Sequence, residues 1–364
     1  MADKFLDLPE NEKKAILVKN QSSLNLPSLA IEKDIWVCWV LQTLFSITER
    51  PKMAFKGGTS LSKIYGAIAR FSEDVDVTID HQTWKNPEKD PFASDLSNSQ
   101  IGKIAKEYEE KTKEFIQKTV IPAFEKEAAT LNIKGIRIEF DGKEALTVVY
   151  PTVMIDSPDI FDNRYMKSNI LVEFGGKNSI EPNNSKLVVP ELSALIPDLI
   201  FPSASVDVLD PERTFWEKAT LIHVECNRTT PKKSFDRLSR HWYDLFKLES
   251  HEIGEMALQN VPLLKDVIKF KKVFFHSSYA NYDDCIAGRF KLYPQNEEMR
   301  RNLEEDYEKM KKSSMFREEP PDFNNIMLRM KEIETQINTE MEKTQAMSYG
   351  SPTLEEDTET IGPE

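Results

Sequence analysis

Two aspartates one residue apart, Asp74 and Asp76, are the side chains of this 364-residue chain that are best suited to chemistry. They stand in Ser-Glu-Asp-Val-Asp-Val-Thr-Ile-Asp, where acids alternate with β-branched residues as in a strand. In a strand both carboxylates point to one face and repel each other, which favours a divalent cation between them. Carboxylate oxygens are hard ligands that suit Mg²⁺. The spacing therefore predicts a Mg²⁺ site, which Mn²⁺ could also fill.

A Gly-Gly-Thr-Ser turn precedes the aspartates by one short helix. The two glycines allow a tight turn and a close approach to a ligand, while the threonine and serine supply hydroxyls. A helix expected over residues 61–68 would point its N-terminal amides at a phosphate. A lysine precedes the glycines here, whereas the lysine of a Walker A loop follows them, so this is not a Walker A loop. Alone, the turn or the Asp pair would be typical of a helix cap or a solvated strand edge, but together they predict a triphosphate cradle facing a metal. The residues of the turn are Lys56, Gly57, Gly58, Thr59 and Ser60.

Two segments carry a resemblance to a known family: Phe-Lys-Gly-Gly-Thr-Ser-Leu-Ser-Lys at 55–63 and Arg-Phe-Ser-Glu-Asp-Val-Asp at 70–76. They resemble the nucleotidyltransferase toxins of the AbiEii/AbiGii family, which belong to the polymerase-β-like superfamily. The similarity extends from about Glu32 to about Leu248, and the C-terminal third resembles no family that we can name. It implies transfer of a nucleoside monophosphate from an NTP to an acceptor hydroxyl. It also implies a set of nucleotide-binding residues: Lys56, Gly57, Gly58, Thr59, Ser60, Arg70, Ser72 and Lys218.

A third carboxylate is usual in this superfamily, on a strand beside the Asp-x-Asp strand, where it binds the metal or takes the proton of the attacking hydroxyl. Glu173 is our first choice because it is the lone acid of an apolar strand, Asn-Ile-Leu-Val-Glu-Phe, where an unpaired charge is costly. Glu139 in Arg-Ile-Glu-Phe is the alternative. Glu173 could instead lie on an exposed face or pair with a basic residue.

Two later motifs also resemble the family. The first is a helix capped by Asp210 and Pro211 that contains Glu217-Lys218, and the resemblance implies that Lys218 contacts the nucleotide phosphates. The second is Arg-His-Trp-Tyr-Asp-Leu, in which the resemblance makes Asp244 necessary for activity. We expect Asp244 to orient Lys218 or a nearby basic residue, although a purely structural ion pair would look the same in the sequence.

A basic segment stands out in a chain whose net charge is −13. The charge argues at first against an RNA substrate, but residues 344–364 contribute five acids and no Lys or Arg. Between residues 228 and 240, five basic residues accompany a single acid, Asp236. Such a segment either binds nucleic-acid phosphates or is simply solvated. The possible nucleic-acid contacts are Arg228, Lys232, Lys233, Arg237 and Arg240.

Composition favours an enzyme of the reducing cytoplasm. The three cysteines, Cys38, Cys226 and Cys285, are far apart and odd in number, which predicts neither a disulfide framework nor a zinc site. The first residues carry acids where a leader would be basic and then apolar, and no apolar run approaches about 18 residues. We therefore expect neither a signal peptide nor a membrane anchor.

Hydrophobic periodicity predicts an α+β fold. The resemblance specifies a polymerase-β-like nucleotidyltransferase core with a mixed sheet and N-terminal helices over residues 1–205. A helical C-terminal domain is expected over 206–343, followed by an acidic, disordered tail at 344–364. Helices are expected at 9–20, 27–45, 101–131, 252–272, 297–312 and 324–343, and strands at 53–56, 75–79, 136–140, 145–150 and 170–174.

The resemblance implies the toxin of a type IV toxin–antitoxin or abortive phage infection system, with a separately encoded antitoxin. Some relatives extend the acceptor end of tRNA, so the tRNA 3′ end is the leading acceptor. Two alternatives remain: the same fold acting on a small molecule or a protein hydroxyl, and a non-catalytic nucleotide-binding module.

Overall fold

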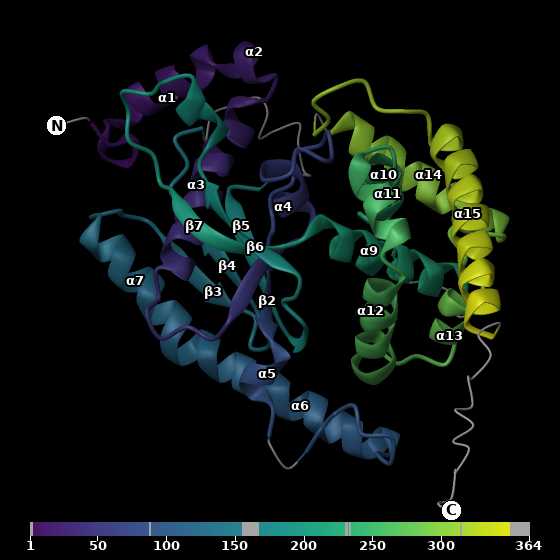
Figure 1. Ribbon diagram of the computed structural model, residues 1–364. Coiled ribbons are helices and arrows are strands. Elements are labelled where there is room, and N and C mark those ends of the chain that lie inside the picture. Colours follow the sequence, from purple (N-terminus) through teal and green to yellow (C-terminus); the bar gives the residue numbers. More distant parts are fainter. Residues whose placement is uncertain are drawn as a thin grey trace, which may run out of the picture.

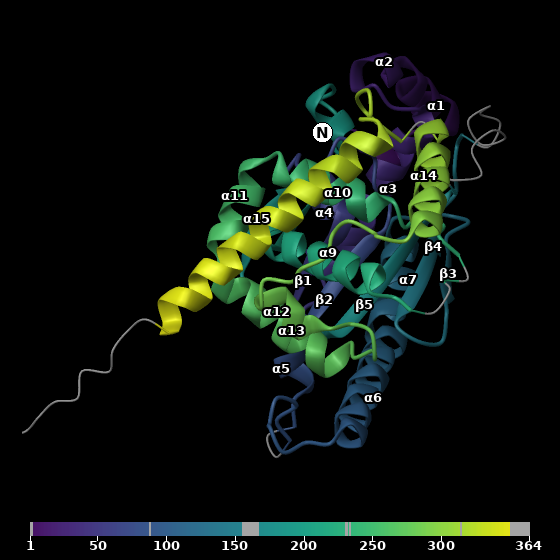
Figure 2. The ribbon, with the colours of Figure 1, turned by 90° about the vertical axis from the view of Figure 1, so that its right-hand side faces the viewer.

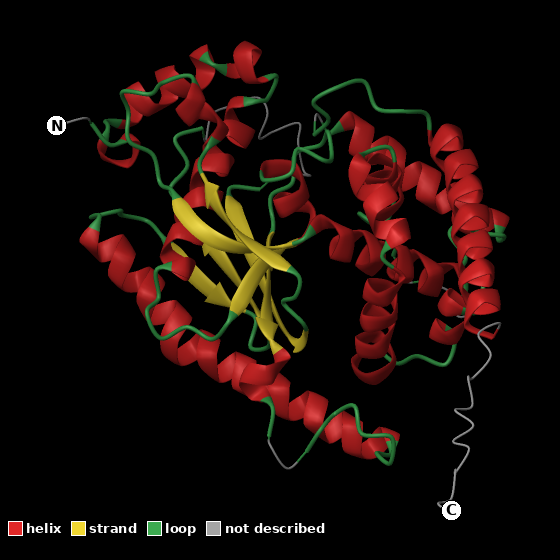
Figure 3. Ribbon diagram, in the orientation of Figure 1, coloured by secondary structure: helices red, strands yellow, loops and turns green. Residues whose placement is uncertain are grey.

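The computed structural model describes residues 3–86, 89–154, 167–229, 232, 234–313 and 315–349, the last five of these by their backbone alone. Within them the chain forms a mixed seven-stranded sheet with helices against it and a group of helices beside it (Figures 1 and 3). The strand order is β3-β4-β5-β2-β1-β7-β6. The strands are β1 (Met53–Lys56), β2 (Val75–Asp80), β3 (Arg137–Phe140), β4 (Ala145–Val149), β5 (Asn169–Asn178), β6 (Asn183–Val188) and β7 (Ala204–Leu209).

One face of the sheet is apolar and covered by helices. Alternate residues of β2 and β5 are buried there, and they pack with α3 (Ser28–Phe45) and with α6 (Asn98–Phe115) and α7 (Ile121–Thr130), which run along the sheet in Figure 1. Because strand side chains alternate between faces, the acidic residues of β2 fall on the opposite face. The long helix expected over 101–131 is interrupted by a π-helical turn, Ile116–Val120, just before Pro122, which cannot donate a backbone hydrogen bond.

The remaining N-terminal elements are short. Leu17 of α1 is fully buried and packs with Leu29 and Ile35 of α3, so the first helices cover one end of the α3 layer. These elements are η1 (Phe5–Asp7), α1 (Glu10–Lys19), α2 (Gln21–Leu24), α4 (Gly57–Lys63), α5 (His81–Trp84) and η3 (Glu191–Ala194).

The C-terminal helices form their own core around Trp216, Trp242 and Tyr307, all fully buried. Figure 2 views this group from its outer side, with the last helix crossing the others. The helix predicted over 297–312 is confirmed, whereas the one predicted over 252–272 is two helices. They separate at Asn260, whose side chain accepts a hydrogen bond from the Leu263 amide and so starts a new helix. The helices are α9 (Pro211–Cys226), α10 (Arg240–Glu249), α11 (Glu252–Gln259), α12 (Val261–Phe274), α13 (Tyr282–Ile286), α14 (Glu297–Lys312) and α15 (Phe323–Tyr349).

The sheet extends past the domain boundary expected at residue 205. β7 pairs with both β1 and β6, so dividing the chain inside β7 would split the sheet, and we propose the division after Leu209. α15 continues to Tyr349, beyond the expected start of the tail at residue 344, and residues 350–364 lie outside the described part of the chain. None of the helices in the described part combines the length and apolarity needed to cross a bilayer.

Candidate active site

Three carboxylates meet on the open face of the sheet. Asp76 of β2 pairs in register with Glu173 of the parallel neighbour β5, and Asp74 immediately precedes β2. The alternative third carboxylate, Glu139, lies on β3 at the far edge of the sheet, exposed and 3.8 Å from Arg137. Of the two glutamates that the sequence offered, the structure therefore places only Glu173 beside the aspartates.

The electrostatics of this acidic group fit a divalent cation. Burial raises the pKa of Asp76. The nearby Lys56 ammonium opposes this effect, and repulsion by the Asp74 carboxylate adds to it. Burial, Asp76 and Asp74 likewise raise the pKa of Glu173, which also shares a hydrogen bond with Asp76. No cluster of three or more His, Cys, Asp or Glu with metal-binding geometry occurs in the described ranges. The crowded, hard oxygen ligands nevertheless have the chemistry that Mg²⁺ or Mn²⁺ requires, because a cation would relieve their mutual repulsion.

The glycine turn fits closely against Asp76. Gly57 has a φ of +81°, and a Cβ at this position would lie 2.0 Å from the Asp76 Oδ2 atom. A Cβ on Gly58 would lie 2.9 Å from a terminal nitrogen of Arg70 and 2.8 Å from the Ser72 hydroxyl. Gly57 is therefore required by its backbone conformation and by the Asp76 carboxylate, whereas a side chain at Gly58 would displace the Arg70 guanidinium or the Ser72 hydroxyl.

The helix after the turn begins earlier than expected. α4 starts at the glycines themselves, at Gly57, and ends at Lys63. The prediction of a helix over 61–68 was therefore wrong in both bounds. The hydroxyls of Thr59 and Ser60 were expected to face the triphosphate, but both side chains are buried within this helix. Thr59 donates to the Asp74 carbonyl at 2.5 Å and Ser60 to the Gly57 carbonyl at 2.9 Å. The Thr59 hydroxyl therefore fixes the segment that carries Asp74, and the Ser60 hydroxyl fixes the first turn of α4.

Across from the carboxylates lies a buried ion cluster from two helices and a loop. The Lys218 Nζ of α9 is 2.8 Å from one Asp244 oxygen on α10, and Arg70 donates to both oxygens of the same carboxylate at 2.7 and 2.8 Å. Burial alone would raise the pKa of Asp244, but Arg70 and Lys218 hold it well below its usual value. Burial lowers the pKa of Lys218 despite the attraction of Asp244. Asp244 thus joins two of the predicted nucleotide-binding cations.

A second ion cluster closes the other end of the site. The Lys56 Nζ lies 3.0 Å from Glu217, whose other oxygen accepts from Asn178 at 2.6 Å. Burial would raise the pKa of Glu217, but Lys56, Lys271 and Arg213 lower it to about 2. Lys271 reaches this carboxylate from α12, and its own pKa is lowered to about 8, chiefly by burial.

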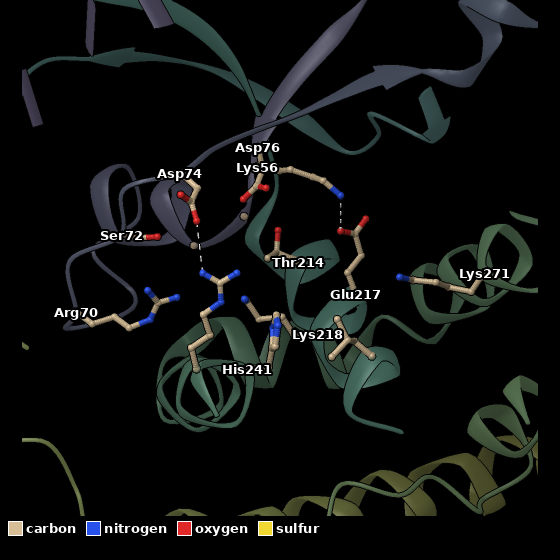
Figure 4. Close-up of a pocket in the computed structure, with 14 residues that line it drawn as sticks. Lys56, Arg70, Ser72, Asp74, Asp76, Thr214, Glu217, Lys218, His241 and Lys271 are labelled. Atoms are coloured by element: carbon tan, nitrogen blue, oxygen red, sulfur yellow. Dashed lines mark hydrogen bonds and ion pairs between the residues drawn. The ribbon is translucent and has the colours of Figure 1, made fainter. Parts of the chain in front are cut away.

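These groups line one pocket of about 240 Å³ between the sheet and the helices (Figure 4). In Figure 4 Asp74 and Asp76 lie on one side, and Lys218 and His241 approach from the opposite side. Burial and the neighbouring Lys218 and Arg240 push the pKa of His241 far below its usual value, so its imidazole is neutral. The lining consists of Lys56, Gly57, Gly58, Arg70, Ser72, Asp74, Asp76, Thr214, Glu217, Lys218, Leu221, Arg240, His241 and Lys271.

Some lining residues were not predicted. Thr214 and Leu221 stand three or four positions from both Glu217 and Lys218 on α9, a helical spacing that the sequence did offer as a signal. Lys271 lies more than fifty positions after Lys218, and its position depends on how α12 packs against α9. Glu173 was predicted for the site, but it lies beside the pocket, next to Asp76 in the sheet.

The basic segment divides into two parts. Arg228 and Lys232 both pair with Glu225 near the end of α9, at 2.8 and 3.2 Å, away from the pocket. Arg237 and Arg240 approach Asp74, to 3.3 and 3.5 Å. Lys233 lies outside the described residues.

Comparison with known proteins identifies the family of this chain. Residues 39–329 match the family model described as nucleotidyl transferase AbiEii toxin, type IV toxin–antitoxin system. Among solved structures, MenT4, a nucleotidyltransferase toxin from Mycobacterium tuberculosis H37Rv, aligns over 92% of this chain and 99% of its own, with 14% identity and a TM-score of 0.39. No curated protein matches the sequence. The family match, which covers most of the chain, carries the assignment.

Proposed function

This chain belongs to the AbiEii nucleotidyltransferase toxin family of type IV toxin–antitoxin systems, and from that premise we propose its reaction and substrate. It transfers a nucleoside monophosphate from an NTP to the 3′-terminal hydroxyl of tRNA, with Mg²⁺ or Mn²⁺. The observation that supports this proposal is one pocket with Asp74 and Asp76 on one wall and the buried cations Arg70 and Lys218 on the other. Such a pocket suits a metal-bound triphosphate.

Each wall has its own task in the reaction. Asp74, Asp76 and Glu173 would hold the metal, which when bound stabilises the charge of the transferring phosphoryl group. The backbone of Gly57 and Gly58 lies against the triphosphate, and Lys218 and Arg70 neutralise it, both positioned by Asp244. The acceptor oxygen bonds to the α-phosphorus, the bond to the β-phosphate oxygen breaks and pyrophosphate leaves. A neighbouring carboxylate takes the acceptor proton, a role that suits Glu173 because its pKa is raised.

We further propose that the toxin acts in the cytoplasm and is restrained by a separately encoded antitoxin, in the context of phage defence. Arg237 and Arg240 support an RNA acceptor because they stand beside Asp74 at the edge of the pocket. A second candidate acceptor, a small-molecule or protein hydroxyl, is favoured by another observation. Arg228 and Lys232 are already paired with Glu225, which reduces the positive charge offered to RNA.

The test is a transfer assay with purified protein, Mg²⁺, total tRNA and each α-labelled NTP in turn. We expect label on tRNA with the wild type and none with the Asp74→Ala/Asp76→Ala double variant. Binding of NTP without label on any RNA would contradict the tRNA proposal and favour the small-molecule or protein acceptor. Absence of pyrophosphate release with every acceptor would favour the non-catalytic module.

A further inference from the structure

A second cavity adjoins the carboxylates on the side away from the triphosphate pocket. It measures about 210 Å³, and Asp74 is the residue that it shares with the first pocket within the described residues. The two cavities are of similar size. The second cavity is lined by Lys33, Glu73, Asp74, Thr147, Lys167, Asn169, Leu171 and Arg237.

The cavity lies on the open face of the sheet. Ile170 and Val172 of β5 are buried against the helices, so the intervening Asn169 and Leu171 face the other way. Thr147 of β4 pairs in register with Leu171. Thr147 and Asn169 are thus carried by strands, which hold them more rigidly than a loop would.

A buried charge network supports the cavity wall. Lys33, only 2% exposed, donates to Glu73 at 2.6 Å and to the Lys167 carbonyl at 2.8 Å. Glu73, 4% exposed, also lies 3.4 Å from Arg237, which in turn approaches Asp74. These bonds satisfy the deepest charges, and they fix Arg237 between the cavity and the catalytic carboxylate.

Three other polar groups of the cavity have no side-chain partner among the residues that the structure describes. Within the described part of the chain, the Thr147 hydroxyl and the Asn169 amide make no side-chain hydrogen bond, and the Lys167 ammonium makes no ion pair. A hydroxyl and an amide together can donate to and accept from adjacent sugar hydroxyls. Lys167 and Arg237 suit the phosphate that joins such a sugar to the rest of a strand.

We propose that this second cavity is the acceptor subsite and receives the 3′-terminal ribose of an RNA, with Thr147 and Asn169 binding its two adjacent hydroxyls. The inference rests on the proposed transfer reaction and specifies its acceptor side. Because Asp74 belongs to both cavities, a hydroxyl held in the second stands next to an α-phosphate held in the first. That is the near-attack arrangement that transfer needs.

The test compares Thr147→Val and Asn169→Leu with the wild type in equilibrium binding of a short RNA labelled at its 5′ end. The RNA carries either an intact 3′-terminal diol or a 2′,3′-dideoxy end. Each substitution removes hydrogen bonds while nearly preserving volume, so we expect about tenfold weaker binding of the intact RNA. Binding of the dideoxy RNA and of NTP should be unchanged. Ser185→Ala, which removes a strand hydroxyl at the opposite edge of the sheet, is the matched control.

The outcomes separate this inference from the proposed function. Equal binding of both RNAs by the wild type, or wild-type binding by both variants, would overturn the subsite even if tRNA is labelled. Diol-dependent binding that the variants weaken would support the subsite even if no nucleotide is transferred. In an active preparation, the KM for the RNA should rise about tenfold in the variants, with the KM for NTP unchanged.

Discussion

The acids on the two walls of the triphosphate pocket stand in opposite environments. On the sheet side, Asp76 and Glu173 lie beside other carboxylates, and their pKa values are raised. On the helix side, Asp244 and Glu217 are surrounded by cations, and their pKa values are lowered. Within the described residues, Asp76 and Glu173 therefore have no directly paired cation, whereas Asp244 and Glu217 each pair with two cations.

The different surroundings of these acids suit two roles, metal binding on the sheet side and stabilisation of the fold on the helix side. A carboxylate cluster that lacks positive charge stores repulsion, which a metal ion can relieve, so these acids favour binding and chemistry at the expense of stability. A carboxylate saturated by buried lysine and arginine contributes to the fold and keeps those cations in position. We expect substitutions on the two walls to separate activity from stability.

The largest effect is expected on the sheet side. Asp76→Asn should lower the transfer rate by about a thousandfold, because it removes a metal ligand next to the reacting phosphate. The free energy of unfolding should stay unchanged or rise, since repulsion with Asp74 is relieved. The measurements are the initial rate of label transfer and urea unfolding. Asp207→Asn, in the same sheet on β7, is the control, and Asp76→Asn transferring at the wild-type rate would disprove the mechanism.

The next effect is expected on the helix side. Asp244→Asn leaves Arg70 and Lys218 without their buried counter-charge, which should cost about 3–5 kcal/mol of unfolding free energy. Urea unfolding followed by circular dichroism measures it. Asp283→Asn, which breaks an exposed pair with Lys272, should change stability by under about 0.5 kcal/mol. Equal stability losses in the two variants would contradict the structural role of Asp244.

The smallest effect concerns Lys271 and its pKa of about 8. Its ammonium is present below that pH and lost above it, so NTP affinity should fall about three- to fivefold as the pH rises through 8. Lys271→Gln should flatten this part of the pH profile, whereas Lys272→Gln should leave it intact. Titration of NTP binding from pH 7 to 9 provides the measurement, and an unchanged profile in Lys271→Gln would rule out this role.

Local signals predicted much of the fold. α14 matches its prediction because an amphipathic pattern follows a capping asparagine, Asn296. The mixed α+β fold and the family were also correct. β6 and β7 were not predicted: β6 is a polar edge strand, Asn-Asn-Ser-Lys-Leu-Val, whose pairing with β7 is not visible in its own sequence.

The site was predictable where its residues are close in sequence. The glycine turn and the Asp pair are separated by one short helix. Glu173, far from them in the sequence, was chosen over Glu139 only because the family resemblance called for a third carboxylate and its strand is apolar. The pairing of Arg237 with Asp74 was not predictable, because those residues are 163 positions apart and meet through tertiary packing. The sequence showed a basic segment, and only the fold shows which acids it faces.

The hydrogen bond between Arg70 and Asp244 joins residues 174 positions apart, so the two walls of the pocket are synthesised at different times. A chain emerges from the ribosome from its N-terminus, and its N-terminal units fold first. The acidic wall can therefore form while α9 and α10 are still being made, before any cation from those helices can hold a triphosphate. We expect a chain released early from a stalled ribosome to be harmless, since the toxin acquires its activity late in its own synthesis.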